Sequence, residues 1–302
     1  RQTFILCGLS FYTMLSKNIS VFFTLAVLGL FKPHFSSAQN SDSLHVLIQK
    51  MQRGENDSIR TNAASEFQKR FTDSLNSANS FENPFTDFKN VSIVKDAENR
   101  FKIYSWTFPN YAGDKYMYFG YVQIKEEKTD SILTFLLSDS TSIIQKPESE
   151  KLKADRWFGA AYYAVNKVKY KGKNYFVLLG WKGFNQQITK KVIEVCYIDK
   201  GELKFGFPLL KSGSVYKNRL IYSFNSQASM SMRFENNGKK IILDHISTPR
   251  SKSTDVDLSS QAGPDGTYDS FNLKKGRYVL DKDVDARSET APVKELPQPS
   301  EK

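Results

Sequence analysis

Apolar and polar positions divide the chain into three parts, and the first part carries a single apolar run. Lys17 precedes this run, which spans residues 19 to 31, and the small residues 36 to 38 follow it. A positive residue, a short apolar segment and a small-x-small site are typical of a secretory signal peptide. The pattern predicts a signal peptide over residues 14 to 38, cleaved before Gln39.

The same run is too short for a membrane anchor. A transmembrane helix needs about 20 apolar residues, whereas Lys32 and Pro33 end this run early, and no cysteine follows it to accept a lipid. Residues 1 to 13 precede the first methionine, so residues 1 to 38 are interpreted as upstream residues and signal peptide. We expect an exported protein, periplasmic or extracellular, with no stable membrane span after cleavage.

The second part, residues 39 to 90, has apolar positions three and four residues apart, as on one face of a helix. These positions are Leu44, Leu47, Ile48 and Met51, and then Ile59, Ala63, Phe67, Phe71 and Leu75. Ser41 to Ser43 can cap the first helix and Asn56 or Asp57 the second, while Gly54 and Pro84 are stop signals. We expect two helices that pack on the following sheet.

From about Val91 to Val284 the pattern is extended. Strand-like stretches rich in aromatic and β-branched residues occupy residues 100–108, 116–124, 167–171 and 175–179. Residues 199–201, 236–238 and 274–276 each end in glycine, as tight hairpin turns require.

Short connections of this kind join antiparallel neighbours, because parallel strands need crossovers of about a dozen residues or more. The sequence therefore predicts a mainly β protein, an antiparallel meander over residues 91 to 286. Closure as a sandwich, a barrel or a propeller-like array stays open. Residues 247 to 264 are predicted to be a long loop, and residues 287 to 302 a disordered tail.

Composition and charge limit the classes of binding partner that are expected. The formal charge of +11 falls to +8 after processing, because Arg1, Lys17 and Lys32 leave with no acidic residue. The lysines are scattered, which favours a solvated surface or attraction to anionic envelope polymers. Nucleic acid is not expected as a partner of an exported protein. Cys196 is the only cysteine after residue 38 and lies in an apolar stretch, which favours a buried, unreactive thiol.

Four stretches carry a resemblance to a known group. They are residues 100–106 (RFKIYSW), 178–181 (LLGW), 227–234 (QASMSMRF) and 263–269 (GPDGTYD). Together they resemble uncharacterised exported proteins of Bacteroidota-type bacteria, over most of the predicted mature chain. The resemblance implies an envelope or exported location and carries no known activity.

Asp244 and His245 are the first candidates for catalysis, because they follow a predicted strand and the predicted mature chain has one other histidine, His45. Acid–base chemistry there would need a third group from elsewhere in the fold. The structural alternative is a hydrogen-bonded histidine at a sheet edge.

Asp281, Asp283 and Asp285 are calcium candidates, since they match the first three carboxylates of a calcium loop. Ala286 stands where that loop needs glycine, and Pro292 stands where it needs a bidentate glutamate. Turn hydrogen bonding is the alternative role of these aspartates.

Trp106, Trp157 and Trp181 are candidates for stacking on sugar rings or peptides if they lie exposed on one face, and for core packing if they do not. Motifs for serine nucleophiles, phosphate-binding loops and zinc proteases are absent from the sequence, and no cofactor is expected. We therefore expect an exported, envelope-associated module that binds a ligand or partner, such as an envelope polymer or protein, without catalysis. The alternative is a hydrolase acting on envelope or imported polymers through paired carboxylates, which leave no local signature.

Overall fold

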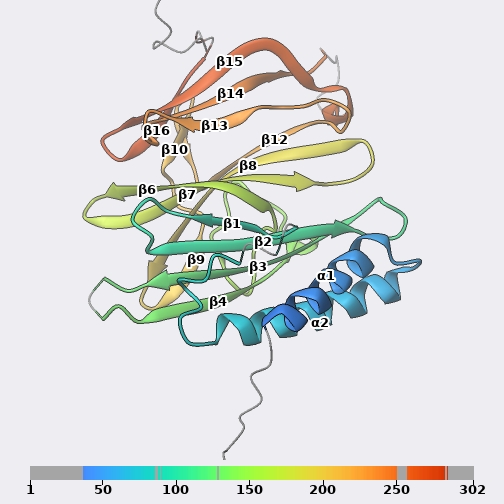
Figure 1. Cartoon of the computed structure of the whole chain (residues 1–302). Helices are drawn as coiled ribbons and strands as arrows, with labels where there is room; N and C mark the ends of the chain where they lie inside the picture. The colour runs from blue at the N-terminus through green and yellow to red at the C-terminus, as the bar shows by residue number, and fades with distance from the viewer. Residues whose placement is uncertain are drawn as a thin grey trace, which may run out of the picture.

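The protein forms four stacked layers in a computed structural model that describes residues 37–85, 88, 90–127, 129–249, 257–282 and 284. A pair of helices is the first layer, and three β-sheets follow, which we call the helix-side, middle and outer sheets (Figure 1). Three apolar cores separate the layers. The fold is thus mainly β with two N-terminal helices, as predicted, and no closed barrel occurs in the described part of the chain.

The helical layer consists of α1 (Ser37–Arg53) and α2 (Asp57–Leu75). Asn56 caps α2, because its side chain accepts a hydrogen bond from the Ile59 backbone N–H at 2.9 Å. Phe67 and Phe71 are fully buried against the helix-side sheet, as expected for helices that dock on it. The prediction that Ile59 belongs to the buried apolar face is wrong, since it is 39% exposed, whereas the neighbouring Arg60 is buried.

The helix-side sheet is a meander. Its strands are β1 (Ser92–Lys95), β2 (Phe101–Pro109), β3 (Tyr116–Lys125) and β4 (Ile132–Ser138), in that order. Alternation along β2 directs Tyr104 and Trp106 to the helices and Phe101 and Ile103 to the middle sheet. Both faces of β2 are therefore covered.

The middle sheet has the order β5-β9-β8-β7-β6, with β12 paired to β8. Its strands are β5 (Leu152–Lys153), β6 (Ala161–Tyr170), β7 (Lys173–Gly183), β8 (Ile188–Asp199), β9 (Glu202–Phe205) and β12 (Arg219–Asn225). Val177, Leu178 and Leu179 on β7 are completely buried, with Leu178 facing the helix-side sheet and the other two facing the outer sheet. The continuous apolar run at residues 175–179 thus marks a strand covered on both faces, as predicted.

The outer sheet closes the stack with the order β11-β10-β16-β15-β14-β13. Its strands are β10 (Leu210–Ser212), β11 (Val215–Lys217), β13 (Met232–Glu235), β14 (Lys240–Ser247), β15 (Gly263–Lys274) and β16 (Arg277–Asp281). Short 3-10 helices span Thr141–Ile143 and Ser259–Gln261. All strand pairs in the described residues are antiparallel except β10 with β16, which is a parallel pair that the predicted meander did not include.

The predicted hairpin turns join β8 to β9, β13 to β14 and β15 to β16. In the second of them Asn236, Asn237 and Gly238 have φ values of 51°, 52° and 78°. Asparagine and glycine tolerate this left-handed region better than other residues, so the sequence specifies the turn directly.

Several predicted segments fall partly or wholly outside the described residues. The predicted signal peptide lies outside them up to residue 36, while its last two residues, Ser37 and Ala38, begin α1. The predicted tail, 287–302, lies outside them entirely. Part of the predicted loop is strand, because β14 includes Ser247 and β15 begins at Gly263. No described helix combines the length and apolar character needed to cross a membrane.

A buried ion pair lies inside the stack. Glu194 on β8 and Arg219 on β12 are register partners, and both side chains are completely buried. Arg219 Nε donates to a Glu194 carboxylate oxygen, and its guanidinium also donates to the Pro147 carbonyl. Burial raises the pKa of Glu194, and the neighbouring guanidinium opposes this shift. Each charge therefore depends on the other for compensation.

Removal of one partner should cost far more than removal of both. We expect Arg219→Met to lower the free energy of unfolding by about 3–5 kcal/mol, because Glu194 is left buried without a counter-charge. The double variant Glu194→Leu, Arg219→Met should recover most of this loss. Urea unfolding of the single and double variants measures both quantities, and equal losses in the two proteins would contradict the interpretation.

Candidate functional site

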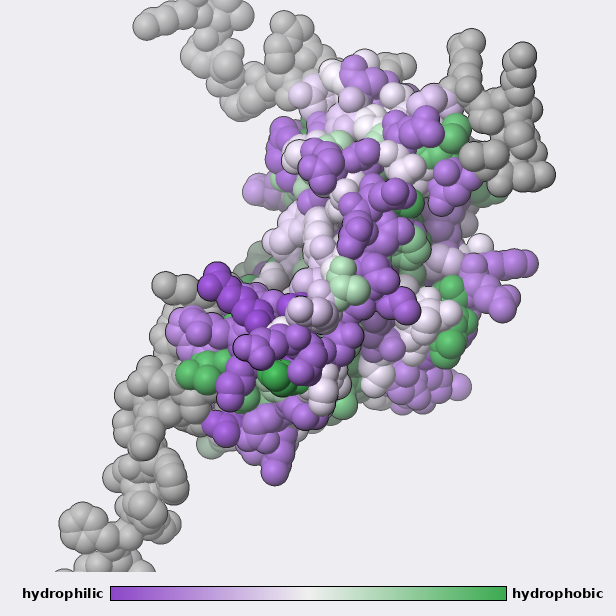
Figure 2. Space-filling model, turned by 90° about the vertical axis from the view of Figure 1, so that its right-hand side faces the viewer, coloured by the Kyte–Doolittle hydropathy of each residue, from purple (hydrophilic) through white to green (hydrophobic). Residues whose placement is uncertain are grey.

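Three connections meet at one end of the stacked sheets. They are the β2–β3 turn (residues 110–115), the β7–β8 turn (residues 184–187) and the β12–β13 connection (residues 226–231). They lie at the right-hand end of the molecule in Figure 1, and Figure 2 views the protein from that side. Hydrophilic surface predominates there, and hydrophobic residues occur in small separate groups.

Hydrogen bonds tie these connections together. Gln186 Nε2 donates to the Ala112 carbonyl at 2.9 Å, which joins the β7–β8 turn to the β2–β3 turn. Ser226 Oγ donates to the Gln186 carbonyl at 2.6 Å, which adds the β12–β13 connection. Asp57 at the start of α2 accepts a hydrogen bond from the Tyr111 backbone N–H at 2.6 Å. The end of the molecule is therefore preorganised by contacts that link all four layers.

A pocket of about 490 Å³ opens among these connections, and we call it the Trp181 pocket. Its described lining residues are Gly113, Tyr116, Trp181, Asn185, Gln186, Thr189, Lys191, Phe224, Ser226, Gln227, Ala228, Ser229 and Met230. Aromatic rings, side-chain amides and hydroxyls predominate, and none of the residues in this set is acidic. Such a surface offers apolar ring faces beside donors and acceptors of hydrogen bonds.

Trp181 and Tyr116 form the aromatic wall. Their ring centroids are 5.5 Å apart at an interplanar angle of 82°, an edge-to-face arrangement. Gly183 lies beside both rings, because a Cβ atom there would come within 2.7 Å of each. The absence of a side chain at residue 183 thus allows the two rings to approach.

Lys191 supplies the positive charge of the pocket. It is the register partner of Trp181 across β7 and β8, and its Nζ lies 4.3 Å from the ring centroid of Tyr163. Burial lowers the pKa of Lys191. Within the described part of the chain its ammonium has no ion pair with a carboxylate and no hydrogen bond.

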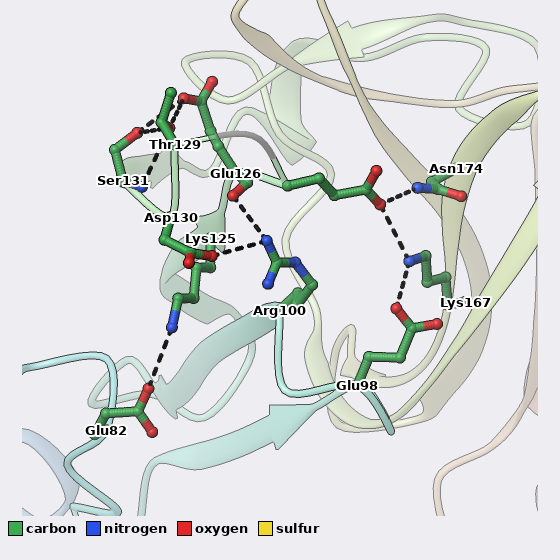
Figure 3. Close-up of polar contacts among 11 residues, drawn as sticks. Glu82, Glu98, Arg100, Lys125, Glu126, Thr129, Asp130, Ser131, Lys167 and Asn174 are labelled. Carbon is green, nitrogen blue, oxygen red and sulfur yellow. Dashed lines mark hydrogen bonds and ion pairs between the residues drawn. The ribbon is translucent and has the colours of Figure 1, made fainter.

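A second cavity, of about 740 Å³, lies at the opposite end of the sheets. Several of the charged groups around it form ion pairs (Figure 3). Arg100 pairs with Asp130 at 3.0 Å, and Lys167 pairs with Glu98 at 2.7 Å and with Glu127 at 3.5 Å. Because these contacts join the turns of the helix-side and middle sheets, we interpret this cluster as structural.

Lys182 is a buried cation with a perturbed pKa. It is 1% exposed, and its Nζ donates to Thr141 Oγ1 at 2.8 Å and to the Gly159 carbonyl. The ring centroids of Tyr118 and Phe158 lie 4.1 and 4.4 Å from the same atom. Burial lowers the pKa of Lys182 to about 7. The group is enclosed and lines neither cavity, so it supports the fold rather than a site.

Lys182 should make stability depend on pH. The ammonium of an unfolded lysine keeps its proton up to pH values near 10.5, whereas folded Lys182 loses it near 7. The unfolded state therefore binds more protons between these values, and stability rises with pH. Relative to Lys182→Met, the wild type should gain about 3 kcal/mol between roughly pH 7 and 9.5. Urea unfolding across this range tests the prediction, and a constant difference between the two proteins would contradict it.

The predicted catalytic residues Asp244 and His245 contact different partners. His245 Nδ1 lies 2.8 Å from Asp269 Oδ2, and its Nε2 lies 4.0 Å from Asp265 Oδ2, while Asp244 accepts a hydrogen bond from the Ser231 backbone N–H. The pairing of β14 with β15 brings Asp269 beside the histidine. Both ring nitrogens thus face carboxylates, and none of these residues lines the described pockets.

The predicted calcium residues are described only in part. Asp281 accepts a hydrogen bond from Asn272 Nδ2 at 2.7 Å and lies 3.7 Å from Lys274 Nζ. Asp283 and Asp285 lie outside the described residues. Among the residues that are described, no group of three or more histidine, cysteine or acidic side chains could hold a metal.

The three tryptophans occupy different environments. Trp106 is buried beneath the helices, and Trp157 is buried between two sheets, where its Nε1 donates to Tyr162 Oη at 3.1 Å. Trp181 lines the Trp181 pocket, whereas Trp106 borders only a void of about 10 Å³ beneath the helices, and Trp157 lines none of the described pockets. Sequence reasoning named it for stacking but missed Lys191 and the surrounding amides. Cys196 is fully buried, which raises the pKa of its thiol well above the usual value.

Comparison with known proteins places the chain in no family. No protein-family model, no curated protein and no solved structure matches this chain. The geometry of the Trp181 pocket is therefore the basis for a functional proposal.

Proposed function

We propose that this protein is an exported, non-enzymatic binding module of the cell envelope, and that it holds a saccharide in the Trp181 pocket. The observation that carries the proposal is the combination of Trp181 and Tyr116 with amide and hydroxyl side chains in one preorganised cavity. Sugar rings present apolar C–H faces and a belt of hydroxyl groups. The aromatic wall suits the faces, and the polar side chains suit the hydroxyls.

The location at the envelope is supported by the sequence alone. The predicted signal peptide and the resemblance to exported proteins of Bacteroidota-type bacteria both favour export. An envelope polymer of carbohydrate would then be within reach of the pocket.

The hydrolase alternative finds less support. Glycosidases of the common types need two carboxylates flanking the scissile bond, and the described lining of the Trp181 pocket contains none. At the opposite end of the sheets Asp130 pairs with Arg100, and Glu98 and Glu127 pair with Lys167. The carboxylate of Glu126 there accepts hydrogen bonds from Thr129 and Ser131. Binding without bond cleavage is the activity that the pocket favours.

Trp181→Ala should abolish most saccharide binding. Truncation of a central aromatic side chain commonly costs about 2 kcal/mol or more, which is roughly a 30-fold loss of affinity. The measurement is binding of the purified protein to an array of envelope and plant oligosaccharides, followed by calorimetry on the best ligand.

Tyr216→Ala is the matched control, because Tyr216 is 40% exposed on β11 and lines none of the described pockets. It should bind like the wild type. Equal affinity of the Trp181→Ala variant and the wild type would remove the pocket from consideration as the site.

A further inference from the structure

We propose that the Trp181 pocket selects acidic saccharides, and that the ammonium group of Lys191 binds the carboxylate of a uronic acid unit. This inference rests on the proposed function, because it names the class of saccharide that the same pocket takes. It goes beyond that function by assigning selectivity to a single residue.

The charge of the pocket is the first argument. Lys191 is its one charged side chain among the described lining residues, and aspartate and glutamate are absent from that lining. A carboxylate entering the pocket would therefore meet a positive charge with no acidic competitor. Asn185, Gln186 and Gln227 add amide groups that can donate to the remaining carboxylate oxygen or to hydroxyls.

The Lys191 ammonium is also incompletely compensated for its burial. Its ammonium is partly withdrawn from water and has the ring of Tyr163 as its partner, with 4.3 Å from Nζ to the centroid. A cation–π contact compensates only part of the lost hydration of an ammonium group. A ligand carboxylate would complete this compensation, and it would stabilise the protonated lysine against the effect of burial on its pKa.

Other partly buried lysines show what is missing at Lys191. Lys167, Lys204 and Lys217 each lie within 3.0 Å of a carboxylate oxygen from the chain itself. Lys191 is comparably placed on a strand and lacks such a partner in the described residues. Lys182 and Lys190 also lack an ion-pair partner in the described residues, but neither lines the Trp181 pocket, so a ligand counter-charge is assigned to Lys191 alone.

Lys191 also lies directly opposite Trp181 in the middle sheet. In the register of the middle sheet it stands between Trp181 on β7 and Tyr222 on β12. Lys191 and Trp181 therefore lie on the adjacent strands β8 and β7, while Tyr116 belongs to β3. A ring stacked on Trp181 would bring a carboxylate substituent on its edge toward Lys191.

The experiment uses calorimetry on the full chain with pairs of oligosaccharides. Each pair consists of a uronic acid oligomer, for example tetragalacturonate or a glucuronate-containing tetrasaccharide, and its carboxyl-reduced neutral counterpart. The wild type should bind the acidic member of at least one pair about 10-fold more tightly. Lys191→Gln should lower the affinity for the acidic member more than the affinity for the neutral member, so that the two affinities become nearly equal.

Lys190→Gln is the matched control. Lys190 is the neighbouring residue on β8, its side chain lies on the opposite face with Nζ 3.8 Å from the Phe184 ring centroid, and it does not line the pocket. This variant should keep the preference of the wild type.

The outcomes separate the two proposals. Binding of acidic and neutral members with equal affinity by the wild type would overturn the inference and leave the proposed function standing. An acidic preference that survives in Lys191→Gln would also overturn the assignment. Failure of every saccharide to bind would overturn the proposed function itself. A short peptide is included with a free and with an amidated C-terminus, and stronger binding of its free form than of any saccharide would overturn both.

Discussion

The middle sheet is covered on both faces, and this constraint governs the rest of the structure. β7 and β8 pack against the helix-side sheet on one face and against the outer sheet on the other. Their interior positions must therefore be apolar or internally paired, because an uncompensated polar group between two sheets would lose its hydration. Glu194 is compensated by its ion pair with Arg219. Lys182 is compensated by hydrogen bonds to Thr141 and Gly159 and by contacts with two aromatic rings.

The two larger cavities among the described residues lie at the two ends of the stack, where the strands give way to turns. The two ends differ in how their charges are used. At one end Arg100 and Lys167 are paired with acids of the chain, which holds neighbouring turns together. At the other end Lys191 lies beside Trp181 and a set of amides with no acidic residue in the described lining. We interpret the first end as structural and propose the other as the ligand site.

Local sequence signals predicted the elements well because their causes are local. The Asn56 cap, the left-handed turn at residues 236–238 and the apolar run at residues 175–179 each act over a few residues. The stacking of three sheets and the parallel pairing of β10 with β16 were not predictable, since they depend on contacts between distant segments. Export and the resemblance to exported proteins stay predictions.

The site was predictable only in outline, because it too depends on contacts between distant segments. Alternation places all three tryptophans on strands or beside them, and only the assembled layers show that Trp106 and Trp157 are core while Trp181 lines a cavity. Lys191 is one of many scattered lysines in the sequence, and only the folded structure shows that it lines the cavity. His245 meets Asp269 because β14 pairs with β15, a register that neighbouring residues do not reveal.

The most direct test of the account is the response of the tryptophan indole N–H groups to a bound saccharide. The chain has three tryptophans, so a ¹H–¹⁵N correlation spectrum should contain three indole signals, and Trp181→Phe assigns one of them. On addition of a saccharide that binds, the account predicts that the Trp181 signal shifts while the signals of buried Trp106 and Trp157 stay in place. An unmoved Trp181 signal at saturating saccharide would contradict the central claim that this pocket is the binding site.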